Sequence, residues 1–248
     1  MNIRDIMPFL AVVLVLVGVV AAAGMAVYII LRLRAGERVG FPLGLLFRVY
    51  LYLISIISIV LMASGASALA QAGVAAVLGK EFSYIPSYVA TAPPQQKPDV
   101  SYQGPSQAEL EAQKRQGLDR AMKEGLLNGI SLLLVGAVAW GLHTWGRRRL
   151  ETKEERDGML HRGYLILLLV VFSVMTLVTL PSAIYDTLRY YILPPLDEFS
   201  NSAHPGGRLA TAMVSFPVWV YYLNIALQLV RRQSEQGAGA AAGKGAAK

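Results

Sequence analysis

The chain has 248 residues, of which 54% are hydrophobic and 16% are charged, and its formal net charge is +7. Soluble domains carry about 25% charged residues, so this composition excludes an ordinary soluble domain and a disordered chain. The sequence contains no cysteine, which excludes disulfides, thiolate nucleophiles and Cys-ligated metal sites. The basic residues gather in short segments beside apolar stretches, a pattern that also argues against nucleic-acid binding.

Five apolar stretches are long enough to cross a membrane, because about 20 helical residues span the hydrocarbon core. They cover residues 8–31, 41–78, 126–145, 163–185 and 209–230. The second stretch is nearly twice as long as a bilayer requires, so we expect it to tilt or to project beyond the outer interface. The sequence therefore predicts an all-α, polytopic transmembrane bundle with five spans.

The distribution of charge predicts the orientation of these spans. The segments 32–48, 147–162 and 231–248 together hold 14 Lys and Arg residues against 6 acidic residues. The rest of the chain holds the remaining 9 basic residues against 10 acidic residues. Cytoplasmic segments are enriched in Lys and Arg. We therefore place the N-terminus outside and the C-terminus in the cytoplasm, in a bacterial inner membrane.

The connecting segments differ in composition. The outer segment 80–123 is rich in Pro and Tyr as far as Pro105, which predicts an extended path. Ser106-Gln107-Ala108-Glu109 is a capping-box sequence, so the third helix is expected to begin in water and to continue into the membrane. The tail, 233–248, is mostly Gly, Ala and Lys, a composition typical of a flexible linker.

These features divide the chain into five parts. They are an N-terminal anchor helix with a basic loop (1–40), a first helix pair with the outer segment (41–146), a basic cytoplasmic loop (147–162), a second helix pair (163–232) and the tail (233–248).

The two helix pairs share a sequence pattern. Residues 48–53 and 162–167 both read Arg-x-Tyr-Leu-x-Leu at the predicted cytoplasmic start of a span. Trp140 and Trp219 occupy equivalent places in the spans that return to the cytoplasm. We infer a parallel repeat of helix pairs, related by an axis along the membrane normal. Chance similarity between apolar helices is the alternative.

The Arg-x-Tyr-Leu start and the segment Trp140-x-x-His143-x-Trp145 resemble a bacterial multi-pass membrane family of unknown function that is built from repeated helix pairs. The resemblance covers roughly residues 41–232. It implies a fold and no established activity.

Basic and aromatic residues near the predicted inner interface are candidates for lipid contact. We expect the two arginines to extend toward headgroups and the aromatic residues to form an interfacial belt, although the arginines could also clamp an anion or a lipid headgroup. These candidates are Arg48, Tyr50, Arg162, Tyr164, Trp140, Trp145 and Trp219.

Two histidines are candidates for cofactor binding. His143 and His161 lie at one predicted membrane depth on neighbouring helices, where two imidazoles could ligate a b-type haem or bind a quinone. Gly136 and Gly141 would leave room for a ring. The alternative, which we favour, is an interfacial histidine without cofactor. Asp186 lies near the outer end of the fourth span, and we expect it to pair with Arg189 at i+3.

No hydrolase, nucleotide-binding or zinc-protease motif occurs in the sequence, so we expect no enzymatic activity. Small and hydroxyl residues at three- and four-residue spacing suit helix–helix contact. We therefore expect an accessory or scaffold subunit of a larger membrane complex, energy-transducing complexes included. Its partners would be lipids and either other subunits or copies of itself. The alternatives are a small homo-oligomeric channel or transporter, and a redox subunit that binds haem or quinone near His143.

Overall fold

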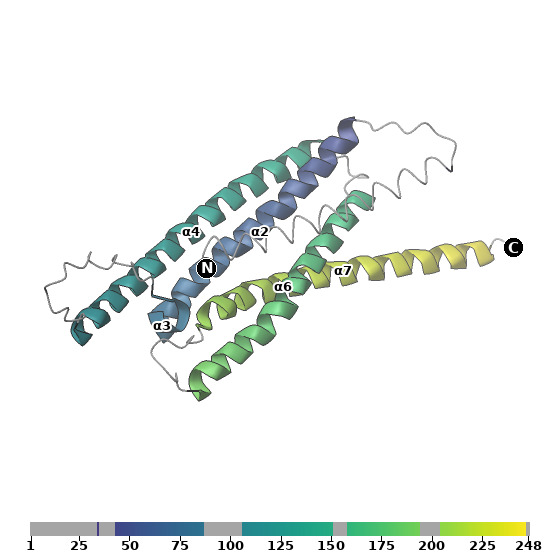
Figure 1. The fold of residues 1–248 in the computed structure, drawn as a ribbon. Helices are drawn as coiled ribbons and strands as arrows, with labels where there is room; N and C mark the ends of the chain where they lie inside the picture. Colours follow the sequence, from purple (N-terminus) through teal and green to yellow (C-terminus); the bar gives the residue numbers. More distant parts are fainter. Residues whose placement is uncertain (1–33, 35–42, 87–105, 151–157, 194–203, 247–248) are drawn as a thin grey trace. The chain divides into compact units, whose positions relative to one another are not determined.

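A computed structural model describes residues 34, 43–86, 106–150, 158–193 and 204–246. Apart from the isolated position 34, the elements in chain order are α2 (Leu43–Leu78), α3 (Lys80–Ser83), α4 (Gln107–Leu150), α6 (Met159–Ile192) and α7 (Gly206–Ala246) (Figure 1). No strand occurs within these ranges. The long helices α2, α4, α6 and α7 are each apolar enough to cross a membrane. The remaining predicted span, 8–31, lies outside the described residues.

The helix α4 begins where the capping box predicts. The backbone N–H of Ser106 donates to the Glu109 carboxylate at 2.8 Å, and the backbone N–H of Glu109 is 3.4 Å from the Ser106 hydroxyl oxygen. These reciprocal bonds satisfy donors that the first turn of a helix leaves open. The prediction that α4 starts well before its apolar stretch is confirmed.

The end of α2 differs from the expected extended path. Gly79 has φ 100°, a left-handed conformation that glycine adopts without strain, and α3 follows it directly. The expectation of an extended chain from Lys80 is therefore wrong over Lys80–Ser83, because the prolines behind it begin only at Pro86. At the other end of the chain, α7 continues to Ala246 through the segment predicted to be a linker. Alanine, the strongest helix former, recurs there.

The helices divide into two compact units. We call the first the α3 unit: it contains Ala63–Leu134 and Val178–Val214, and therefore the end of α2, all of α3 and the start of α7. The second, the arginine unit, contains the start of α2, the end of α4 (from Val135), the start of α6 (to Leu177) and the rest of α7. If successive long helices run in opposite directions, the end of one lies beside the start of the next. Each unit contains helix ends that are related in this way.

Glycines allow α2 and α4 to approach closely. In the α3 unit, a Cβ atom added to Gly65 would lie 2.6 Å from the backbone nitrogen of Leu133 and 2.7 Å from the carbonyl oxygen of Gly129. In the arginine unit, a Cβ atom on Gly136 would lie 2.9 Å from the backbone nitrogen of Met62. Small residues at such contacts let helix backbones pack directly against each other, as is common in membranes.

The short helix α3 connects its neighbours within the α3 unit. Phe82 is buried, and its ring centroid lies 5.0 Å from that of Tyr190 on α6. The side-chain amide of Gln71 on α2 donates to the carbonyl oxygen of Ser83 at 2.6 Å. Lys80 forms an ion pair with Asp119 on α4. The turn after α2 is therefore fixed from three sides.

Candidate functional site

An arginine held by two tyrosine rings is the most distinctive polar feature of the arginine unit. The guanidinium carbon of Arg147 lies 4.6 Å from the ring centroid of Tyr52 on α2 and 5.0 Å from that of Tyr164 on α6. The two rings are 5.3 Å apart, and both tyrosines are buried, with 6% and 8% of their surface exposed. These distances are typical of cation–π contacts.

Helical periodicity explains why Arg147 takes this position. Gly129, Gly136 and Arg147 are separated by 7 and 11 residues, which is close to two and three turns of an α-helix. The face of α4 that contacts α2 through its glycines therefore carries Arg147 to Tyr52. Arg148 and Arg149 are exposed, and the guanidinium of Arg149 lies over the ring of Trp145 at 5.0 Å.

Further polar aromatic residues complete this group. The ring of His161 lies 6.1 Å from that of Tyr164 and 6.3 Å from that of Tyr52. The Tyr164 hydroxyl is in hydrogen-bonding reach of Arg147 and of Tyr222 on α7. We call Tyr52, Arg147, His161, Tyr164 and Tyr222 the arginine–tyrosine cluster. Within the arginine unit it joins all four long helices.

The charge of Arg147 has no acidic counterpart among the described residues. None of their carboxylates lies within ion-pair distance of its guanidinium, and its Nε atom is buried without a hydrogen-bond partner there. Arginine keeps its charge in proteins at any ordinary pH. Arg147 is half-buried, and two cation–π contacts, each of about 1 kcal/mol, offset only part of the cost of removing its charge from water. The arrangement is therefore chemically suited to an anion.

The two candidate cofactor ligands do not converge. Nδ1 of His143 donates to the carbonyl oxygen of Ala139 at 2.7 Å, and the His143 ring lies 5.7 Å from that of Tyr50. His161 contacts Tyr52 instead. Residues two apart on a helix point about 200° apart, so the two imidazoles contact different sides of α2.

Of the two glycines expected to leave room for a ring, Gly141 has no atom within 4 Å of an added Cβ, whereas Gly136 has none of that room. The space beside Gly136 is occupied by Met62, whose Cγ atom would lie 2.8 Å from an added Cβ. Among the residues that the structure describes, no group of three His, Asp or Glu side chains could hold a metal ion.

The remaining interface candidates have mixed environments. Tyr50 is 50% exposed, and Trp140, Trp145 and Arg162 are exposed. Arg48 and Trp219 are half-buried. Tyr164, expected among the headgroups, is instead buried because Tyr52 and Arg147 cover it. Tyr50 and Tyr164, which are equivalent in the proposed repeat, thus have different surroundings.

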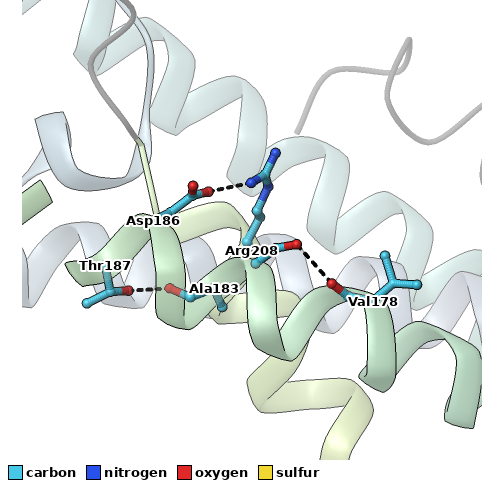
Figure 2. A network of polar contacts seen from close by, with 6 residues as sticks. Val178, Ala183, Asp186, Thr187 and Arg208 are labelled. Atoms are coloured by element: carbon cyan, nitrogen blue, oxygen red, sulfur yellow. Dashed lines mark hydrogen bonds and ion pairs between the residues drawn. The ribbon is translucent and has the colours of Figure 1, made fainter. Parts of the chain in front are cut away.

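Asp186 in the α3 unit forms an ion pair that differs from the expected one. Its carboxylate accepts a hydrogen bond from Nη1 of Arg208 at 2.6 Å, and Figure 2 shows the two side chains pointing toward each other. The prediction that Asp186 pairs with Arg189 is wrong, because the first turn of α7 brings Arg208 opposite α6. The Asp186 side chain is 14% exposed and that of Arg208 is 58% exposed, so this pair joins two helices at the edge of the unit.

A family profile described as a domain of unknown function, DUF5671, matches residues 109–205. This segment includes most of α4, all of α6 and the connections that follow them. Arg147, His161 and Tyr164 lie inside it, whereas Tyr52 and Tyr222 lie outside. No curated protein and no solved structure matches the chain. The match is consistent with an uncharacterised family and assigns no activity.

Proposed function

We propose that the chain is a non-enzymatic integral membrane protein that serves as an accessory or scaffold subunit of a larger membrane complex. The observation that carries this proposal is the low burial of two helices within the chain. Only 11% of the most apolar stretch of α4 and 6% of that of α7 is buried, against 39% for both α2 and α6. Among the described residues, the apolar stretches of these two helices therefore contain few fully buried positions.

The exposed side of α4 is continuous. It buries a narrow face of glycines against α2, while large apolar residues at helical spacing lie on the outside: Leu127, Leu134, Val138, Leu142 and Trp145. Lipid tails are as apolar as these side chains. A partner helix would therefore associate with α4 through close packing rather than through the hydrophobic effect. Because α4 buries little of its surface against the other described helices, it has apolar surface available for such a partner.

Four buried hydroxyl groups are hydrogen-bonded within their own helices, whereas those of Thr176 and Ser215 have no partner among the described residues. Ser55, Ser58, Ser67 and Thr211 each donate to a carbonyl oxygen one turn earlier in their own helix, at 2.7 to 3.0 Å. Hydroxyls engaged in this way do not offer a continuous polar path to water or ions. The channel alternative therefore gains no support from them, and the divergence of His143 and His161 does not favour a haem-binding subunit.

The proposal includes the topology derived from the charges: five spans in an inner membrane, with the N-terminus outside, the C-terminus in the cytoplasm and two repeated helix pairs. Arg48, Arg147, Arg162 and Arg231 all belong to the arginine unit, which supports a single cytoplasmic side. Gly136 and Ser215, which are equivalent in the repeat register, are both buried. Because the chain has no natural cysteine, the variants Glu109→Cys and Arg148→Cys can test the orientation. An impermeant maleimide applied to intact cells should label only the first.

The accessory role is tested by gentle purification from native membranes and mass spectrometry of proteins that remain at equal stoichiometry. A photo-crosslinking residue at Val138 on α4 should capture the same subunit in cells. The same residue at Leu177 on α6 is the matched control, since both positions are exposed apolar residues. A defined partner captured from Val138 and not from Leu177 supports the proposal. A chain that purifies alone as a homo-oligomer contradicts it and favours the channel.

A further inference from the structure

We propose that the arginine–tyrosine cluster is a binding site for a phosphate group, with Arg147 as its anchoring residue. The starting observation is a guanidinium that is enclosed by two buried tyrosines and faces no described carboxylate. Its Nε atom is buried without a hydrogen-bond partner among the described residues, and the hydroxyl of Thr144, one turn earlier, is in the same state. Buried polar groups of native proteins are rarely left unpaired, so this pair of donors indicates a missing acceptor.

The geometry of the cluster selects the kind of acceptor. The two tyrosine rings lie on one side of the Arg147 guanidinium, because their centroids are only 5.3 Å apart and lie 4.6 and 5.0 Å from its carbon. The N–H bonds of a guanidinium lie in its plane, and those that point away from the rings stay available to an acceptor. A planar edge of donors matches the oxygens of a phosphate or carboxylate, which it can bind through two parallel hydrogen bonds. Aromatic contacts that hold the guanidinium in one orientation also reduce the entropy lost on binding.

The surroundings of Arg147 favour phosphate. Arg148 and Arg149 follow it directly and are exposed, and Arg162 at the start of α6 belongs to the same unit. These residues raise the local concentration of anions without pairing with one another. The cluster lies at the ends of apolar helices, where phospholipid headgroups are the most abundant source of phosphate. A soluble phosphate compound shares the same chemistry, so the experiment separates the two sources.

One rival explanation comes from the chain itself. Four acidic residues follow α4 in the sequence, and all of them lie outside the described residues: Glu151, Glu154, Glu155 and Asp157. A carboxylate from one of these residues would be an internal counter-ion for Arg147. A variant in which all four acids are replaced by their amides therefore belongs in the experiment.

The test measures thermal unfolding of the full chain in nanodiscs of phosphatidylcholine, with and without phosphatidylglycerol. Native mass spectrometry then counts the anionic lipids retained. Arg147→Gln is compared with Arg148→Gln, which removes the same charge from the next, exposed position. Both are measured at low salt and at about 0.5 M salt, where exposed charges are largely screened. Inorganic phosphate added to the detergent-solubilised chain tests the soluble source.

We expect phosphatidylglycerol to raise the unfolding temperature of the unmodified chain. At high salt, Arg147→Gln should weaken lipid retention by about tenfold or more, the loss typical of a charge-assisted hydrogen bond, while Arg148→Gln should change it by less than about twofold. If Arg147→Gln does not fold, Arg147→Lys keeps the charge and should still weaken retention, because it lacks the planar edge.

Four outcomes decide the proposal. Protection by phosphatidylglycerol that depends on Arg147 supports it and identifies a lipid headgroup as the source. Protection by inorganic phosphate that depends on Arg147 supports it with a soluble source. Equal losses in Arg147→Gln and Arg148→Gln overturn it in favour of general surface charge. The proposal is also overturned if two results occur together. The four amide substitutions lower the unfolding temperature of a chain that keeps Arg147 but not of the Arg147→Gln variant, and added anions have no effect.

Discussion

The contact between α2 and α4 makes a quantitative prediction about one methyl group. In Gly65→Ala, the new Cβ would lie 2.6 Å from a backbone nitrogen and 2.7 Å from a backbone oxygen of α4, whereas ordinary van der Waals contact begins at 3.4 Å. The helices must therefore separate locally by about 0.8 Å, the difference between 3.4 and 2.6 Å. Because both obstructing atoms belong to the backbone, no side-chain rotation relieves the contact.

Overpacking of this kind costs about 1 to 3 kcal/mol, and the better helix propensity of alanine returns at most about 1 kcal/mol. Gly73 is the matched control, because it lies on the same helix with no atom within 4 Å of an added Cβ. Gly73→Ala should gain the propensity term and pay no steric cost. We therefore expect the free energy of unfolding of Gly65→Ala to be lower than that of Gly73→Ala by about 1 to 3 kcal/mol.

The assay is reversible unfolding in mixed micelles of dodecyl maltoside and increasing sodium dodecyl sulfate, followed by circular dichroism. The midpoint and slope give the free energy of unfolding for each variant. Gly136→Ala repeats the test in the arginine unit, where a Cβ would lie 2.9 Å from the backbone nitrogen of Met62. Equal stabilities of Gly65→Ala and Gly73→Ala, within about 0.5 kcal/mol, would refute the close approach of the two helices.

Three further predictions concern the α3 unit. A double-mutant cycle between Asp186→Asn and Arg208→Gln should give a coupling energy of only about 1 kcal/mol, because the Arg208 side chain is largely exposed. The control cycle between Asp186→Asn and Arg189→Gln should give no coupling energy. Coupling in the control cycle would show that Asp186 pairs with Arg189 instead. Burial raises the pKa of Tyr84, so its hydroxyl ionises more readily in the unfolded chain than in the folded one. The contribution of Tyr84 to the free energy of unfolding should therefore be constant below about pH 10 and decrease above it. Tyr84→Phe should flatten that fall in a thermal scan from pH 8 to 11, and an unchanged slope would assign it to other groups. Gln71→Leu removes the side-chain amide that donates to the carbonyl oxygen of Ser83 in α3. It should lower the free energy of unfolding by about 1 to 3 kcal/mol in the same micelle titration. No change would mean that the other contacts of α3 are sufficient to hold it.

Features encoded locally could be read from the sequence. A capping box places its hydrogen bonds within four residues, so Ser106 and Glu109 identify the start of α4 without knowledge of any other helix. The apolar stretches likewise identify the four long helices of the described residues, and the end of α2 at Leu78 is as predicted. The helices α4, α6 and α7 extend beyond their apolar stretches into segments that hydropathy does not mark.

Features set by contacts between helices could not be read in this way. Asp186 had a local partner at i+3, yet its partner in the structure is 22 residues away, because the phase of α7 relative to α6 determines which arginine faces it. Arg147 illustrates a signal that was present and overlooked. Three successive arginines suggest a uniform basic loop, but only Arg147 is in phase with Gly129 and Gly136 on the face toward α2.

The closeness of α2 and α4 also restricts how this sequence can change over generations. Gly65 and Gly129 share one small volume, since a Cβ on either would press on the other residue's carbonyl oxygen. Because each obstructing oxygen belongs to the backbone, a second replacement at the other position does not relieve the contact, and both positions favour glycine. Gly73 and Gly141, which have no neighbour within 4 Å, carry no such restriction. The inner side of α4 is thus held nearly constant by its own chain, while its outer side remains free to vary together with whatever it contacts.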